Sequence, residues 1–91
     1  MKTIQVSHIL VEREYEAQDL LKALQQGKSF ADLAKKFSRC SSAQQGGDLG
    51  VVAIHRLDED FADAAMALKP GEISKSPVRT KFGYHIIKKP G

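Results

Sequence analysis

The sequence predicts an α+β domain in which helices pack on a single sheet. Residues near both ends of the chain alternate between apolar and polar side chains, with the two-residue period of a strand. Between these ends, apolar residues recur at intervals of three and four, the period of an amphipathic helix. The predicted order is strand, helix, helix, strand, helix, short strand, strand.

The first strand covers residues 3–11. His8 shares one face of this strand with Val6 and Leu10, because side chains two residues apart point the same way. Apolar residues also fill the opposite face near the end of the segment, which predicts a central position in the sheet.

Two helices follow this strand. The period changes at Glu14, and Gly27 stands where a glycine commonly ends a helix. Ser29 then reads as an N-cap, with Asp32 as the acidic residue three positions later. The apolar stripes are Ala17, Leu20, Leu21 and Leu24 in the first helix, and Phe30, Leu33, Ala34 and Phe37 in the second.

The middle of the chain is a polar loop followed by a strand and a helix. Residues 38–45 are polar and lead into a glycine-rich turn at 46–50. Residues 49–54 read as a short strand. Asp58 can cap a third helix, which the Lys-Pro-Gly run at 69–71 ends.

The last quarter contains the remaining strands. Residues 73–78 include Pro77, so they form a poor strand and are expected at an edge or in a loop. Residues 83–88 read as the last strand, with His85 and Ile87 on one face.

Length and composition indicate one domain over residues 1–91. The single cysteine excludes an internal disulfide and a framework of paired cysteines for a metal, and a lone thiol fits a reducing compartment. The N-terminus does not resemble a signal peptide, and no apolar run is long enough to span a membrane. We therefore expect a cytoplasmic, monomeric domain that acts on its own without metal or cofactor.

The chain is mildly basic, with 14 Lys and Arg residues against 11 Asp and Glu and a net charge of +3. That excess is too small to indicate nucleic-acid binding by itself. Arg79, Lys81, Lys88 and Lys89 crowd the last strand, but no aromatic series for base stacking accompanies them. A solvated basic face is the simpler interpretation, and a patch for acidic peptides or nucleic acid is the alternative.

A few residues are candidates for chemistry. His8 and His85 lie mid-strand in apolar company, where each taken alone is more typical of a hydrogen-bonded core residue than of a catalyst. Cys40 lies in a polar loop, which is unusual for an inert buried cysteine. Leu57 and Phe61 are one helical turn apart, and a core role is the default for such a pair.

Three segments resemble the parvulin-type peptidyl-prolyl isomerases. Residues 7–11 (SHILV) resemble the opening strand of that family, residues 40–43 (CSSA) leading into 47–50 (GDLG) resemble its central loop, and residues 82–87 (FGYHII) resemble its last strand. The resemblance covers essentially the whole chain. It implies a four-stranded antiparallel sheet with adjacent histidine strands, surrounded by about four helices in a βαααβαββ order.

The resemblance also implies the site residues. The family's strand histidines fall on His8 and His85, its threonine falls on Thr80, and a loop position that is Cys or Asp in different members falls on Cys40. Many parvulins carry Met where this chain has Leu57, which implies a changed pocket edge rather than a lost pocket. The implied pocket for the substrate proline consists of Leu49, Leu57, Phe61 and Phe82.

The implied reaction is rotation about an X–Pro peptide bond, which amide resonance opposes with a barrier of ~18–20 kcal/mol. No bond breaks, so the chemistry requires no nucleophile. The twisted amide has a less polar carbonyl than the planar one, so an apolar pocket helps by removing the water that favours the planar form. Leu57 and Phe61 would hold the proline ring while the preceding carbonyl swings.

Cys40, His8, His85 and Thr80 are expected to form a hydrogen-bonded network beneath the pocket. A pair of neutral histidines needs one donor and one acceptor, so a neighbour such as Thr80 would set the tautomers. Cys40 is interpreted as an electrostatic group near the carbonyl carbon. Thiolate attack ranks below that role, and a mainly structural role for the four residues stays open.

Some parvulins select phosphorylated Ser or Thr before proline through a basic loop after the first strand. Residues 12–16 (EREYE) hold that place here, with three acids against one base. Because a phosphate would meet net repulsion there, we expect no phosphate requirement. The expected substrates are proline-containing polypeptides in unfolded or flexible segments.

Two other functions are alternatives to the isomerase. A proline-peptide-binding chaperone module with little catalytic activity needs only the pocket, so the presence of the full set favours the enzyme: His8, Cys40, Phe61, Thr80 and His85. A cysteine hydrolase using Cys40 lacks an evident oxyanion arrangement or third orienting group.

Overall fold

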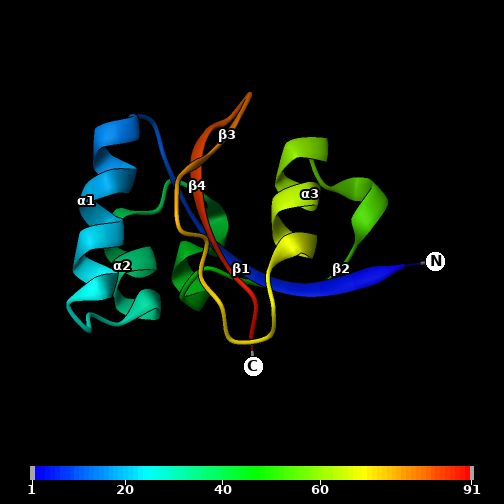
Figure 1. The fold of residues 1–91 in the computed structure, drawn as a ribbon, viewed down its shortest axis with the longest axis horizontal. Coiled ribbons are helices and arrows are strands. Elements are labelled where there is room, and N and C mark those ends of the chain that lie inside the picture. Colours follow the sequence, from blue (N-terminus) through cyan, green and yellow to red (C-terminus); the bar gives the residue numbers. More distant parts are fainter. Residues whose placement is uncertain (1, 91) are drawn as a thin grey trace.

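A single antiparallel sheet forms the centre of the structure, a computed structural model that describes residues 2–90. Its strands are β1 (Thr3–Val11), β2 (Asp48–Ala53), β3 (Val78–Thr80) and β4 (Gly83–Lys88). They pair in the order β2-β1-β4-β3 (Figure 1). The two strands that carry the histidines, β1 and β4, are therefore central and adjacent, as predicted.

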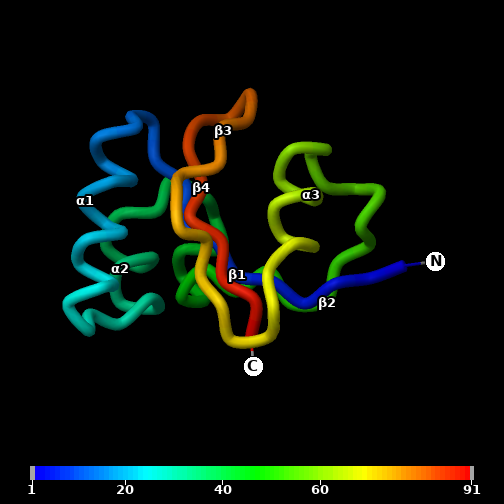
Figure 2. Tube along the Cα trace, viewed as in Figure 1, coloured from blue at the N-terminus to red at the C-terminus, as the bar shows by residue number. Residues whose placement is uncertain are grey.

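Helices cover both faces of this sheet. The helices α1 (Glu14–Gln25) and α2 (Phe30–Phe37) lie on one face, and α3 (Glu59–Ala67) lies on the other (Figure 2). Both predicted N-caps are present: the Ser29 hydroxyl accepts a hydrogen bond from the Asp32 amide at 3.3 Å, and the Asp58 carboxylate accepts one from the Asp60 amide at 3.0 Å. These caps start α2 and α3 at the predicted positions.

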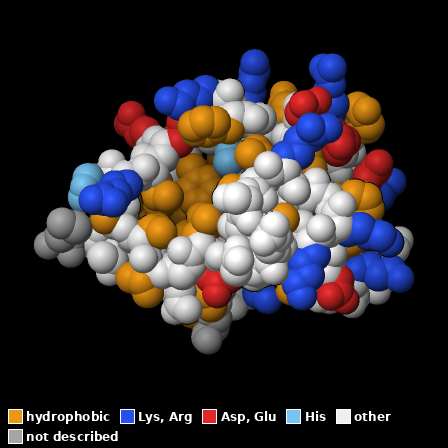
Figure 3. All heavy atoms as spheres, turned by 180° about the vertical axis from the view of Figure 1, so that it is seen from behind, with side chains coloured by type: hydrophobic (Ala, Val, Ile, Leu, Met, Phe, Trp, Pro, Cys, Tyr) orange, Lys and Arg blue, Asp and Glu red, His pale blue; other side chains and the backbone are white. Residues whose placement is uncertain are grey.

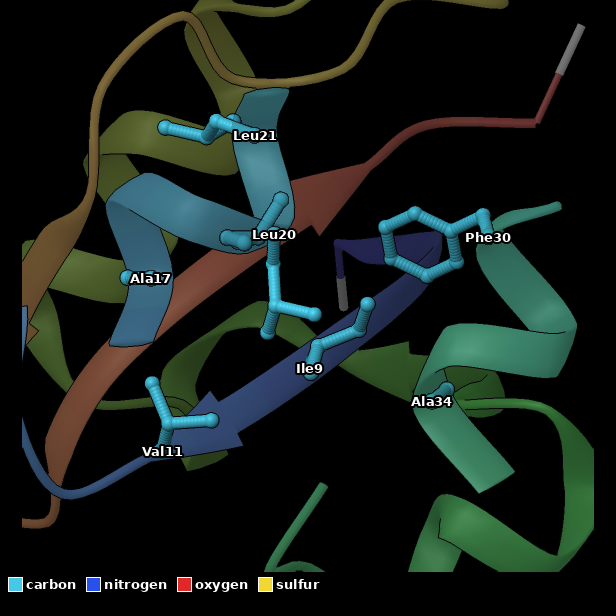
Figure 4. Packing of buried hydrophobic residues seen from close by; sticks show 8 residues of the cluster. Ile9, Val11, Ala17, Leu20, Leu21, Phe30 and Ala34 are labelled. Carbon is cyan, nitrogen blue, oxygen red and sulfur yellow. The ribbon is translucent and has the colours of Figure 1, made fainter. Parts of the chain in front are cut away.

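The pleat of β1 and β4 divides the apolar core into two clusters. Ile9, Val11 and Ile86 face α1 and α2, where they pack with the predicted helix stripes (Figure 4), except for Phe37, which is exposed. Val6 and Ile87 face α3 and pack with Phe61. Because side chains alternate along a strand, His8 and His85 project from the same face as Val6 and Ile87.

The central loop reaches β1 through a glycine. The His8 amide donates to the Gly47 carbonyl at 2.9 Å, directly after the β1–β2 ladder ends at Ser7 and Asp48. Gly47 has a φ of +86°, and a Cβ there would lie 2.4 Å from the carbonyl oxygen of His8. Only glycine permits this approach, which fixes the loop that carries Cys40 beside the first histidine.

Two details differ from the sequence prediction. Residues 2–90 contain three α-helices rather than about four, because the polar loop forms only a short 3₁₀ helix, η1 (Ser41–Gln45), and a second one, η2 (Ile54–Arg56), precedes α3. The edge strand begins at Val78, after Pro77, because proline has no amide for a ladder. Within the segment expected to be a poor strand, Ser74 exchanges hydrogen bonds with Ile87 instead: its amide donates to the Ile87 carbonyl, and its hydroxyl accepts from the Ile87 amide.

No helix within residues 2–90 has both the length and the apolar character that crossing a bilayer would require.

Candidate active site

The two strand histidines meet where β1 and β4 pair. Leu10 lies opposite His85 in the ladder, and Ile87 lies opposite His8, so the imidazoles are diagonal neighbours on the α3 face. Their rings stack with centroids 5.1 Å apart and an interplanar angle of 19°. The two Nδ1 atoms are 2.9 Å apart, a hydrogen-bond distance. One histidine must therefore donate to the other.

The β3–β4 hairpin holds the second histidine from its other side. Thr80 pairs with Gly83, so only Lys81 and Phe82 form the turn between the strands. Thr80 Oγ1 lies 2.7 Å from His85 Nε2 and also accepts a hydrogen bond from the Phe82 amide at 3.2 Å. Both nitrogens of the His85 ring are thus engaged, and its orientation is fixed.

The hydrogen-bond partners assign the tautomers. His8 Nε2 is buried and has no hydrogen-bond partner among residues 2–90. Orphaned buried donors are rarer than under-satisfied acceptors, so Nε2 is the bare nitrogen and Nδ1 carries the proton. His8 Nδ1–H then donates to His85 Nδ1, and His85 Nε2–H donates to Thr80 Oγ1, whose two lone pairs accept both this bond and the Phe82 amide.

Phe61 packs edge-on against both imidazoles. Its ring centroid lies 5.4 Å from that of His8 and 5.0 Å from that of His85, with interplanar angles of 82° and 81°. All three rings are nearly inaccessible to solvent. Such edge-to-face contacts are favourable between aromatic rings, so α3 locks the histidine pair against the sheet.

Burial keeps the histidine pair neutral. Burial and, secondarily, the neighbouring His85 ring lower the pKa of His8 from 6.5 to about 4. Burial likewise lowers the pKa of His85 to about 4, against the opposing attraction of the Asp58 carboxylate. Burying a charged imidazole away from water costs free energy. Both rings are therefore uncharged at neutral pH.

A hollow of about 280 Å³ opens above the histidine pair. Figure 3 shows it as a depression lined by hydrophobic side chains with a histidine inside. Every residue predicted for the site lines this hollow except Thr80, which lies behind His85. The lining consists of His8, Leu10, Cys40, Leu49, Arg56, Leu57, Asp58, Phe61, Phe82 and His85.

Cys40 departs from the predicted network. None of the hydrogen bonds within the described part of the chain involves its sulfur; its amide donates to Ser38 Oγ at 3.4 Å, and that hydroxyl also accepts from the Leu10 amide at 3.1 Å. The observed network is His8–His85–Thr80, with the thiol as a separate wall of the hollow. The loop is held through its backbone, so the thiol needs no hydrogen bond to keep its place.

Sequence reasoning missed three lining residues. Leu10 shares the face of His8, so its period-2 position was sufficient to find it. The sequence marks Asp58 only as a helix cap, and no sequence pattern places Arg56, at the end of the 3₁₀ turn η2, beside the hollow.

Comparisons with known proteins identify the family to which the chain belongs. The PPIC-type PPIase domain of the rotamase family matches residues 8–90. Foldase protein PrsA of Bacillus subtilis (strain 168) is 52% identical over 87 residues, covering 94% of this chain and 30% of the relative. The crystal structure of PrsA from Bacillus subtilis superposes with a TM-score of 0.92 at 50% identity, over 98% of this chain and 35% of that one.

A single-domain structure matches over nearly its whole length. The solution structure of NmPin, the parvuline of Nitrosopumilus maritimus, has a TM-score of 0.86 at 41% identity and covers 100% of this chain and 98% of that one. This chain belongs to the PPIC-type, or parvulin, family of peptidyl-prolyl cis–trans isomerase domains, which confirms the resemblance seen in the three motifs. It spans about a third of the length of the curated foldases that it matches.

The neutral histidine pair predicts how stability changes with pH. Each ring has a pKa of about 4 in the folded state and an ordinary value of 6.5 when unfolded, so the unfolded chain binds more protons between these values. The contribution of the two neutral rings to the free energy of unfolding is complete above pH 6.5 and decreases as the pH drops toward 4. Urea unfolding should therefore give a lower free energy of unfolding at pH 5 than at pH 7, in a window above most carboxylate titrations.

The exposed His55 provides the matched control. His55→Gln should leave the decrease between pH 7 and pH 5 unchanged, since this exposed side chain lies outside the buried histidine pair. A wild-type free energy of unfolding that stays flat across this interval would contradict the buried neutral pair.

Proposed function

We propose that the hollow around His8, His85 and Phe61 is where this domain accelerates rotation about X–Pro bonds in unfolded or flexible polypeptides, without a covalent intermediate. The observation that carries the proposal is an apolar hollow built directly over a hydrogen-bonded, neutral histidine pair. At about 280 Å³ it lies at the small end of ligand pockets, which suits one proline ring and its adjoining peptide groups.

The apolar part of the hollow supplies positioning and desolvation. Leu49, Leu57 and Phe82 surround the place for the proline ring, and Phe61 packs against the histidine pair at its floor. Shortening an exchange time of ~10–100 s to about 10 ms requires roughly 4–6 kcal/mol of preferential stabilisation of the twisted amide. Removing water from the carbonyl favours the twisted form, because the planar amide is the better hydrogen-bond acceptor.

The polar part supplies fixed, uncharged groups. A neutral histidine pair places no positive charge beneath the amide, which would otherwise favour the planar, more polar carbonyl. Cys40 borders the same hollow. We assign its polarisable sulfur an electrostatic role near the carbonyl carbon as the amide twists. His8, His85 and Thr80 hold the floor in position rather than react.

The structure around the first loop supports the absence of a phosphate requirement. Only Glu12 and Arg13 separate β1 from α1, so this connection has no basic loop. The Glu12 carboxylate instead pairs with Arg39 at 3.3 Å. The names of the relatives, foldase proteins, support polypeptides as substrates. The monomeric state, the cytoplasmic location and the lack of nucleic-acid partners remain predictions from the sequence.

NMR exchange spectroscopy on an unphosphorylated Ala-Leu-Pro-Phe peptide tests the proposal. Catalytic amounts of protein should produce cis–trans cross-peaks, and Phe82→Ala should lower kcat/KM about tenfold, the effect of losing roughly 55 Å² of apolar contact. Phe37→Ala is the matched control, because Phe37 is also exposed but belongs to α2 on the opposite face of the sheet. Peptide shift changes without exchange enhancement would instead indicate a binding module.

Substitutions at Cys40 separate an electrostatic role from a covalent one. Cys40→Asp should keep most of the activity, since a carboxylate places negative charge at the same wall without forming an acyl intermediate. Cys40→Ser should lower the exchange rate by about tenfold or less while the peptide Kd changes little. An inactive Cys40→Asp variant with normal folding and binding would contradict the electrostatic role, and full activity in Cys40→Ser would reduce the thiol to a wall of the hollow.

A further inference from the structure

Two charged residues border a hollow that is otherwise apolar apart from its histidines and cysteine. Arg56, the last residue of η2, and Asp58, the N-cap of α3, flank Leu57 at the mouth. The proposed isomerase mechanism uses neither charge, so their effect on a bound peptide is a separate question.

The carboxylate of Asp58 is committed to its own helix. Its Oδ1 accepts a hydrogen bond from the Asp60 amide at 3.0 Å, and it lies at the positive end of the α3 dipole. Arg39, next to Cys40, is also committed, because it pairs with Glu12 at 3.3 Å. The charge of Arg39 is therefore balanced by Glu12, whereas Asp58 keeps its negative charge but is held at the start of α3 by the Asp60 amide.

Arg56 differs from both. It is exposed, and no carboxylate within residues 2–90 lies at ion-pair distance from it. Its backbone is held in place, because the neighbouring Leu57 amide donates to the Ile54 carbonyl at 3.1 Å and the Leu57 side chain packs into the core cluster under α3. A second cation lies near the mouth, with Lys81 Nζ 5.2 Å from the centroid of the Phe82 ring.

We propose that Arg56 determines specificity by favouring peptides with an acidic side chain next to the proline, an inference that rests on the proposed function. A proline ring in the hollow leaves the side chains of its neighbours at the mouth, since adjacent Cα atoms are about 3.8 Å apart. The planar guanidinium presents donors that match a carboxylate. A solvent-exposed pair of this kind corresponds to a preference of about two- to fivefold, which salt should screen.

The test compares matched peptides by exchange spectroscopy and by peptide Kd from shift titration. Ala-Glu-Pro-Phe is compared with Ala-Gln-Pro-Phe, and Ala-Leu-Pro-Glu with Ala-Leu-Pro-Gln. At low salt the wild type should favour Glu over Gln by about two- to fivefold in at least one pair. Arg56→Gln should abolish the preference, and Arg56→Glu should reverse it toward a Lys-containing peptide.

Lys35→Gln is the matched control, because it removes one positive charge from α2 on the opposite face and should keep the preference. Equal kcat/KM and Kd for Glu and Gln peptides, or a preference that survives in Arg56→Gln, would overturn the assignment. A preference that disappears equally in Lys35→Gln would also overturn the assignment, because the net charge of the protein would then account for the preference. Absence of exchange with every peptide would refute the proposed function, while the Kd values would still decide the role of Arg56.

Discussion

The hydrogen bond between His8 and His85 is the contact on which the organisation of this domain depends. It joins the two central strands across residues far apart in the sequence, and it forms only if β1 and β4 are adjacent and in this register. Thr80 fixes the second ring from the edge strand, and Phe61 fixes both rings from α3. Elements on three sides of the pair are therefore positioned by one buried polar contact.

This contact also determines the chemical character of the hollow. A buried imidazole pair held at low pKa is uncharged, so the floor resembles the apolar walls more than a polar active site. Such a surface is suited to a reaction that breaks no bond and whose transition state is less polar than its ground state. The polar residues hold shape, the apolar residues exclude water, and the charges remain at the mouth.

Much of this arrangement follows from local sequence signals. The alternation over residues 3–11 and 83–88 predicts both histidine strands and their faces, and Ser29 and Asp58 mark the starts of two helices. The pairing of these strands is not local, and it followed from the resemblance to a family rather than from periodicity. The prediction that the site residues surround one hollow also followed from that resemblance.

Other features escaped prediction for identifiable physical reasons. The edge strand is displaced because the hydroxyl of Ser74 replaces a ladder partner for β4, which no hydrophobic pattern reveals. The resemblance to the family implies a hydrogen-bonded Cys40, but no sequence pattern shows that the Ser38 hydroxyl accepts from the Cys40 and Leu10 amides and so holds this loop without the thiol. The position of Arg56 depends on a single 3₁₀ turn, too short to leave a periodic signal.

The most direct test of this account is to determine the protonation of the two rings in ¹⁵N-labelled protein by long-range ¹H–¹⁵N correlation at pH 7. Both rings should be neutral, with the proton of His8 on Nδ1 and that of His85 on Nε2, since this arrangement leaves a bare acceptor rather than an orphaned donor at the buried His8 Nε2. An imidazolium at either position, or a His8 ring protonated at Nε2, would contradict the arrangement from which the site is built.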